Sequence, residues 1–120
     1  MRIAIGSFAG LPLTPAIATE DYVFVTGQVG SGPDGAYPAD IEVQTRVALE
    51  KLGALLEQAG SSYDRVVKTT VFLTDVREFP AMNRVYAEFF PHEPPARSTV
   101  GCQLVDVGAK VEIEAIALRR

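Results

Sequence analysis

The segment from Val111 to Leu118 alternates strictly between two kinds of position. Its odd-numbered positions are all aliphatic, whereas its even-numbered positions begin with Glu112 and Glu114. Successive side chains of a β-strand point to opposite faces, so this pattern predicts a strand in a sheet with one covered face. The two glutamates then share the other face. The apolar side of such a sheet must be covered by a second layer of structure.

Three other segments are rich in β-branched and aromatic residues, which predicts further strands at 22–26, 64–74 and 98–104. Two segments with apolar residues at helical spacing, 41–59 and about 79–89, lie between them. This order predicts an α+β fold in which a mixed sheet carries both helices on one face. We expect a single domain over residues 1–120, because no linker or internal repeat interrupts the pattern.

The ends of both helices are marked in the sequence. Asp40 is a suitable N-cap for the first helix, and Gly60 suits the left-handed position that follows its last turn. Pro80 fits the first turn of the second helix. Prolines between positions 91 and 95 then prevent that helix from continuing.

Charge and composition exclude several classes of function. With 11 Lys and Arg against 15 Asp and Glu, the net charge is -4, so we expect no general binding of nucleic acid or of an anionic membrane. One Cys and one His leave no internal disulfide, multi-cysteine zinc site or conventional His-centred triad. No secretory leader is visible and no apolar run approaches the ~20 residues that span a bilayer. The unpaired Cys102 fits a reducing compartment, so we expect a cytoplasmic protein.

Arg97 is the first candidate for a functional side chain. Pro94 and Pro95 restrict the backbone just before it. A guanidinium held by a stiff chain offers a planar fork of donors that matches a carboxylate. The alternative is a structural ion pair or a simple surface position, and the local sequence alone favours this alternative.

Glu112 and the pair Thr26-Gly27 are the other candidates. A partly buried carboxylate can have a raised pKa and can orient or deprotonate water, whereas the alternative for Glu112 is a solvated sheet face. Thr26 and Gly27 offer a hydroxyl and an unhindered backbone N–H to a small anion. The alternative there is an ordinary turn glycine.

Three segments together resemble the Rid family, also called the YjgF/YER057c/UK114 family of small enamine and imine deaminases. They are FVTGQ (24–28); VKTTVFLTD (67–75), followed by Asn83, Tyr86, Phe89 and Phe90; and PARSTV (95–100), continued by VEIEAIA (111–117). They follow one another in the family's order and span most of the chain. The resemblance implies a chorismate-mutase-like, YjgF-like fold and a homotrimer. In that assembly the sheets form a central barrel, and three clefts lie between subunits.

The same resemblance implies roles for individual residues. Arg97 matches the arginine that holds the substrate carboxylate, and Glu112 matches the glutamate that binds or orients the hydrolytic water. Thr26 stands where the family often has serine, beside Gly27, whose backbone contacts the ligand. Thr99 stands where the family often has cysteine, and its backbone lines the site. Arg97 and Glu112 thereby change from structural to catalytic candidates.

Leu13 departs from the family pattern, which usually has tyrosine at this position. The loss of an aromatic wall and a hydroxyl leaves a roomier, less polar substrate pocket. The implied reaction is hydrolysis of small 2-enamino or 2-imino acids, such as 2-aminoacrylate, to 2-oxo acids and ammonia. This is the activity of a 2-iminobutanoate/2-iminopropanoate deaminase, and it needs no metal or organic cofactor.

Other functions remain open at this point. Leu13 keeps open a pathway-specific deaminase of a larger, aminomuconate-like enamine. A non-catalytic module that binds small carboxylates would use the same cleft. A ribonuclease or translation inhibitor, ascribed to some members of the family, is disfavoured by the net charge and by the lack of a basic run.

Overall fold

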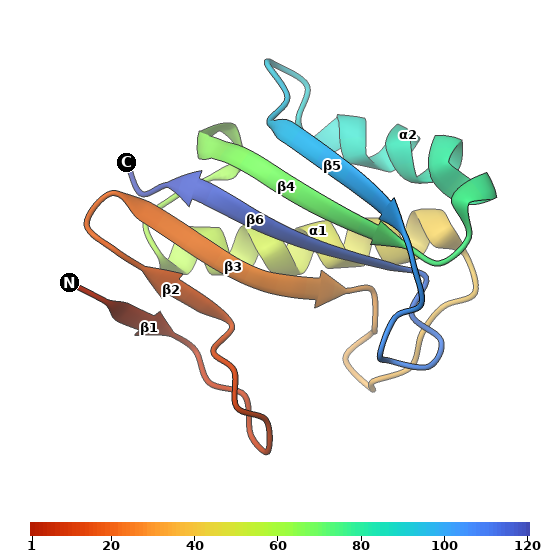
Figure 1. Cartoon of the computed structure of the whole chain (residues 1–120), viewed down its shortest axis with the longest axis horizontal. Helices are drawn as coiled ribbons and strands as arrows, with labels where there is room; N and C mark the ends of the chain where they lie inside the picture. The colour runs from red at the N-terminus through yellow and green to blue at the C-terminus, as the bar shows by residue number, and fades with distance from the viewer.

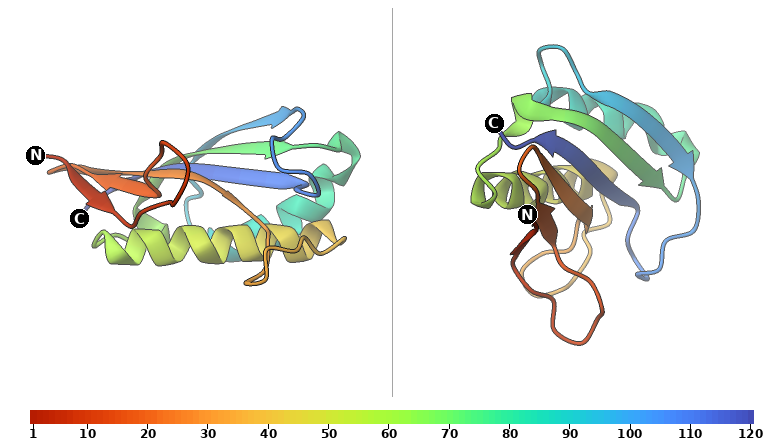
Figure 2. Two further views of the ribbon diagram at one scale, coloured as in Figure 1. Left: turned by 90° about the horizontal axis from the view of Figure 1, so that it is seen from below. Right: turned by 60° about the vertical axis from the view of Figure 1, so that its left-hand side comes forward.

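One six-stranded sheet carries both α-helices on the same face in this computed structural model, which describes residues 1–120 (Figure 1). The view from below in Figure 2 shows the helical layer and the sheet layer edge-on. The elements are β1 (Ile3–Ile5), β2 (Ala16–Ala18), β3 (Tyr22–Val29), α1 (Ile41–Gln58), β4 (Val66–Leu73), α2 (Phe79–Phe89), β5 (Ala96–Gly101) and β6 (Val111–Leu118). Short 3₁₀ turns occupy Tyr63–Arg65 and Val76–Glu78.

The strands lie in the order β1-β2-β3-β6-β4-β5. All neighbours are antiparallel except β4 and β5, which run parallel and are joined through α2. A parallel pair requires such a crossover, because a tight turn cannot bring the chain back to the same end of the sheet. The predicted α+β mixed sheet with two helices on one face is therefore confirmed.

The first helix begins and ends where the sequence predicts. The side chain of Asp40 accepts a hydrogen bond from the backbone N–H of Glu42, 2.7 Å away, and Gly60 follows the helix with φ +82°. Two ion pairs join the exposed flanks of α1 and α2: Arg46 with Glu88, and Arg84 with Glu42, each at 3.0 Å. These exposed ion pairs link the outer faces of the two helices.

The hydrophobic core fills the space between the helices and the sheet. In β6 the odd-numbered residues are buried and the even-numbered residues are partly or fully exposed, as the alternation predicts. The largest fully buried apolar side chains come from both layers: Leu49, Leu52 and Leu56 of α1, Met82 of α2, and Leu73 and Ile113 of the sheet. The opposite face of the sheet has no covering layer within the chain (Figure 2).

The structure adds two strands to the prediction and corrects the bounds of two others. Two short strands, β1 and β2, were not predicted, because three residues each are too few to show an alternating pattern. The predicted strand at 98–104 begins earlier, at Ala96, and ends at Gly101, where pairing with Leu73 ends. β3 continues past Gly27 to Val29 through an irregularity between Val25 and Gln28, so this glycine lies within the strand rather than after it.

Candidate active site

A cleft lies along the free part of β3. β2 pairs with β3 only as far as Val25, so residues 26–29 have no strand beside them on that side. The cleft has a volume of about 430 Å³. It contains Leu13, Thr26, Gly27 and Glu112, which are four of the six predicted site residues, together with side chains that include Lys51, Ser31 and Asp106.

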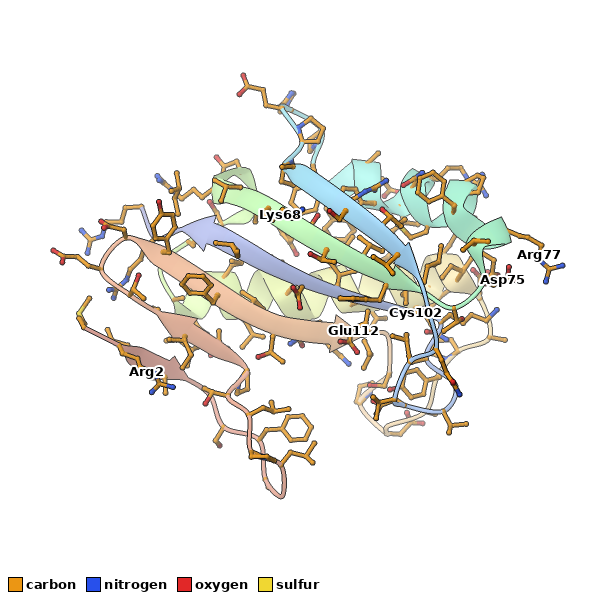
Figure 3. The ribbon with its side chains drawn as sticks, in the orientation of Figure 1. Arg2, Lys68, Asp75, Arg77, Cys102 and Glu112 are labelled. Carbon is orange, nitrogen blue, oxygen red and sulfur yellow. The ribbon has the colours of Figure 1, made fainter.

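Glu112 enters this cleft from β6, in register with Val29 of β3 and Phe72 of β4. Figure 3 shows it beside the end of β3. Its carboxylate lies so close to Gly27 that any side chain at position 27 would overlap it. Burial raises the pKa of Glu112, and the nearby charges of Asp106 and Glu114 raise it further. A glutamate with a raised pKa is better matched to taking a proton from water near neutral pH than an ordinary surface glutamate.

Thr26 holds the loop that carries Leu13 against the edge of β3. Its backbone N–H donates to the carbonyl of Pro15 at 2.9 Å, and its hydroxyl donates to the carbonyl of Thr14 at 2.6 Å. Leu13 is then 39% exposed and forms part of the wall of the cleft. The Thr26 hydroxyl, which we predicted to face a ligand, thus holds the wall of the cleft that carries Leu13.

Arg97 lies in a different hollow, against α2. Its guanidinium carbon is 4.7 Å from the centre of the Tyr86 ring and 5.5 Å from that of Phe79. The hollow also contains Asn83, whose buried side-chain oxygen has no hydrogen-bond partner. None of the chain's four ion pairs involves Arg97. The structural ion pair that the local sequence favoured is therefore absent, and the guanidinium has no carboxylate partner within the chain.

Arg97 and Glu112 point to opposite faces of the sheet. Arg97 pairs with Thr69, whose hydroxyl lies 2.6 Å from that of Tyr86 in α2, so both face the helices. Glu112 alternates with Val111 and Ile113, which are buried beneath the helices. Thr99, paired with the buried Val71, lies on the same side of β5 as Arg97. The chain thus brings four predicted residues together and keeps Arg97 and Thr99 apart from them.

Lys51 and Asp106 line the cleft but were not predicted. Lys51 follows the buried Ala48 by one turn of α1 and so flanks the apolar stripe, which is the one signal that could have pointed to it. Asp106 accepts a hydrogen bond from the hydroxyl of Tyr37 at 2.8 Å. Burial and this carboxylate raise the pKa of Tyr37 to about 12, so its hydroxyl stays protonated and keeps Asp106 in place.

Comparison with known proteins identifies the family of the chain. A sequence model for the family described as Endoribonuclease L-PSP matches residues 7–119, nearly the whole chain. The chain belongs to this family, the Rid (YjgF/YER057c/UK114) family. As a Rid protein it has the fold that the resemblance implied, and many solved relatives share that fold.

Three relatives illustrate the similarity. The mitochondrial protein Mmf2 of Schizosaccharomyces pombe is 40% identical over 111 residues, which cover 90% of this chain and 88% of that protein. The 2-iminobutanoate/2-iminopropanoate deaminase of Mus musculus is 34% identical over 110 residues, covering 90% and 82%. The crystal structure of E. coli TdcF with bound serine has a TM-score of 0.85 at 37% identity, covering 98% and 94%.

Neither helix of this Rid protein could span a lipid bilayer. The name of the S. pombe relative places that protein in mitochondria. A cytoplasmic location for this chain therefore stays a prediction.

Proposed function

We propose that this Rid protein hydrolyses small 2-imino and 2-enamino acids to 2-oxo acids and ammonia, without a cofactor. The observation that carries the proposal is the partly buried Glu112 carboxylate, which lies against Gly27 inside a cleft large enough for a small acid. The names of the mouse relative, and of the chloroplastic Reactive Intermediate Deaminase A of Arabidopsis thaliana, at 39% identity, support this reaction class.

Glu112 would act as the base that activates water. It accepts a proton from the water as the oxygen attacks the imine carbon and passes this proton to the nitrogen, which gives a tetrahedral intermediate bearing a hydroxyl and an amino group. The hydroxyl proton then moves through the Glu112 carboxylate to the amino group, the C–N bond breaks, and ammonia leaves as the carbonyl forms. Because imines hydrolyse readily in water, positioning of the water and the substrate could supply much of the required acceleration.

Arg97 would hold the substrate carboxylate. Its guanidinium is stacked over Tyr86 and has no acidic partner, so its donors remain available for a bidentate contact with an anion. A small amino acid such as the serine bound to E. coli TdcF carries a carboxylate of this kind. Thr99, beside Arg97 on β5, would line the carboxylate end of the substrate with its backbone.

A second copy of the chain would complete the site, because Arg97 and Glu112 of one chain point to opposite faces of the sheet. The uncovered sheet face presents four exposed apolar side chains that could pack against other copies: Tyr22, Phe24, Val100 and Leu118. Exposed apolar patches of this kind commonly mark interfaces. We propose the homotrimer that the family resemblance implies, with the cleft of one subunit receiving Arg97 of its neighbour.

A non-catalytic carboxylate-binding module is the second candidate. It would use the same cleft and the same arginine, but it would bind small acids saturably without turnover. A deaminase of a larger enamine is favoured by the open wall at Leu13, which is 39% exposed. A ribonuclease is disfavoured by the net charge of -4.

The test is release of 2-oxo acid from a freshly generated imine. A serine or threonine dehydratase supplies 2-aminoacrylate or its homologue, and pyruvate or 2-oxobutanoate is followed with time. We expect the wild type to accelerate release and Arg97→Ala to lose that effect. Arg77→Ala is the matched control, because Arg77 pairs only with Asp75 on the surface. No acceleration by the wild type, or equal acceleration by Arg97→Ala, would exclude the proposal.

A further inference from the structure

Lys51 brings a positive charge into the cleft that the reaction described above does not use. It reaches the cleft from α1, next to the same stretch of β3 that Glu112 contacts. We propose that Lys51 binds a second carboxylate of the substrate, so that the preferred substrates are imines of acidic amino acids. This inference rests on the proposed deaminase function for its substrate class, but the binding of a dicarboxylate can be tested independently.

The position of the Lys51 ammonium group is fixed by two neutral acceptors. Its Nζ donates to the carbonyl of Val29 and to the hydroxyl of Ser31, both at 3.0 Å. A lysine ammonium has three N–H donors, so one remains for a ligand. A single remaining donor suits one carboxylate oxygen better than a phosphate, which is usually held by several donors.

No acidic side chain neutralises Lys51. The chain's four ion pairs all involve other residues. Burial lowers the pKa of Lys51, which means that its charge is poorly solvated where it stands. An anion bound at this point would compensate the charge and recover part of the lost solvation.

Two carboxylates, Asp106 and Glu112, also line the cleft, and neither forms an ion pair with Lys51. Asp106 is engaged by the hydroxyl of Tyr37, and Glu112 lies over Gly27. Lys51 donates to the carbonyl of Val29, two residues beyond Gly27 along β3, and two residues of strand span at most about 7 Å. A short dicarboxylic chain bridges a gap of this size, with its imine carbon at Glu112 and its distal carboxylate at Lys51.

A two-electron oxidation of an acidic amino acid would supply such a substrate. Oxidation of an acidic amino acid by a flavin-dependent oxidase removes two electrons and two protons, which O₂ accepts, and leaves the 2-imino dicarboxylate. Hydrolysis of that imine then gives the corresponding 2-oxo dicarboxylate and ammonia. Imines of neutral amino acids would react at the same site without the contact to Lys51.

The binding experiment uses stable 2-oxo acids and needs no catalysis. Calorimetry measures the Kd of 2-oxobutanoate and of 2-oxoglutarate for the wild type, Lys51→Met and Lys51→Arg. Loss of one charge-assisted hydrogen bond should weaken 2-oxoglutarate binding about tenfold or more in Lys51→Met. Binding of 2-oxobutanoate should be unchanged, which shows that the variant is folded, and Lys51→Arg should retain most of the preference.

The catalytic experiment compares two imines made by flavin oxidases, one from alanine and one from aspartate. We expect Lys51→Met to raise KM for the aspartate-derived imine alone. Equal affinity of the wild type for both 2-oxo acids would overturn the inference, even if neutral imines are hydrolysed. So would an equal loss of affinity for both 2-oxo acids in Lys51→Met. If 2-oxoglutarate binds in a Lys51-dependent manner but no imine is turned over, the contact between Lys51 and a second carboxylate is supported and the deaminase function is overturned.

Discussion

The guanidinium of Arg97 lies over the ring of Tyr86, with its central carbon 4.7 Å from the ring centre. The hydroxyl of the same tyrosine lies 2.6 Å from that of the buried Thr69. Tyr86 therefore links Arg97 to the core, because its ring contacts the guanidinium and its hydroxyl contacts Thr69. These two contacts can be separated by substitution.

Arg97→Lys should lose most of the activity, because lysine lacks the planar fork and stacks poorly on an aromatic ring. We expect kcat/KM to fall by about tenfold or more, mostly through a higher KM. Tyr86→Phe keeps the ring and should keep the activity. It should still cost about 1–3 kcal/mol of unfolding free energy, since Thr69 is left without its buried partner. Urea denaturation and steady-state kinetics on both variants measure these effects, and full activity of Arg97→Lys would contradict the assigned role.

Glu112 should set the acid limb of the pH–rate profile. A general base is active only when deprotonated, and burial raises the pKa of Glu112 above its ordinary value. As the pH falls, we therefore expect kcat/KM to begin to decline at a pH that is higher than the ordinary glutamate pKa of about 4.3. Glu112→Gln should lose about 100-fold or more in kcat and should lack this limb. A limb of unchanged position in the residual activity of Glu112→Gln would assign it to another group.

The same pKa shift predicts how stability depends on pH. The folded chain holds the Glu112 proton more tightly than the unfolded chain does. This difference stabilises the fold, and its whole contribution is present when the pH is below the pKa of Glu112 in the unfolded chain. This contribution is lost as the pH rises through the raised folded pKa. Glu112→Gln should therefore gain stability relative to the wild type between about pH 4 and pH 7. Melting temperatures of both proteins at the two pH values provide the comparison, and the opposite trend would mean that Glu112 is not desolvated.

Thr26 should act mainly by positioning the loop that carries Leu13. Thr26→Val has nearly the same shape but removes the hydrogen bond to the carbonyl of Thr14. We expect a several-fold rise in KM with a smaller change in kcat, whereas Thr26→Ser should behave like the wild type. Proteolysis of the loop at residues 8–14 gives an independent readout and should be faster in Thr26→Val only. Equal kinetics in the valine and serine variants would remove this role.

Gly53 lies in the middle of α1, where replacement of glycine by alanine usually stabilises a helix by about 1 kcal/mol. At position 53 we expect the opposite effect, a loss of stability on replacement by alanine. A Cβ at position 53 would overlap the Tyr63 hydroxyl, which donates to the carbonyl of Leu49 at 2.8 Å. We expect Gly53→Ala to destabilise the wild type in urea and to stabilise a Tyr63→Ala background. Stabilisation in both backgrounds would show that Tyr63 moves aside without cost.

Several parts of the fold could be predicted because local chemistry determines them. The alternation of β6 and the Asp40 and Gly60 signals of α1 each depend on neighbouring residues alone, and the structure confirms them. β1 and β2 depend instead on pairing between distant residues, such as Ile3 with Ala18. No pattern within three residues reveals such pairing.

The candidate site was predictable in its residue types but not in its arrangement. The residues around Arg97 and Glu112 resemble those of a known family, yet no spacing along the chain shows that they point to opposite faces. That relationship depends on the parallel register of Arg97 with Thr69. Lys51 was missed because an isolated lysine beside an apolar stripe looks like any solvated position until the end of β3 is folded against it.

Whether the site is shared between subunits is tested most directly by mixing two inactive variants. Arg97→Ala and Glu112→Ala, co-expressed with different tags and purified as mixed oligomers, recreate sites with Arg97 from one chain and Glu112 from the other. In each mixed trimer, roughly a third of the sites receive both residues, so the mixed oligomers should recover imine hydrolysis that neither variant has alone. Mixed oligomers as inactive as the separate variants would contradict a site shared between copies.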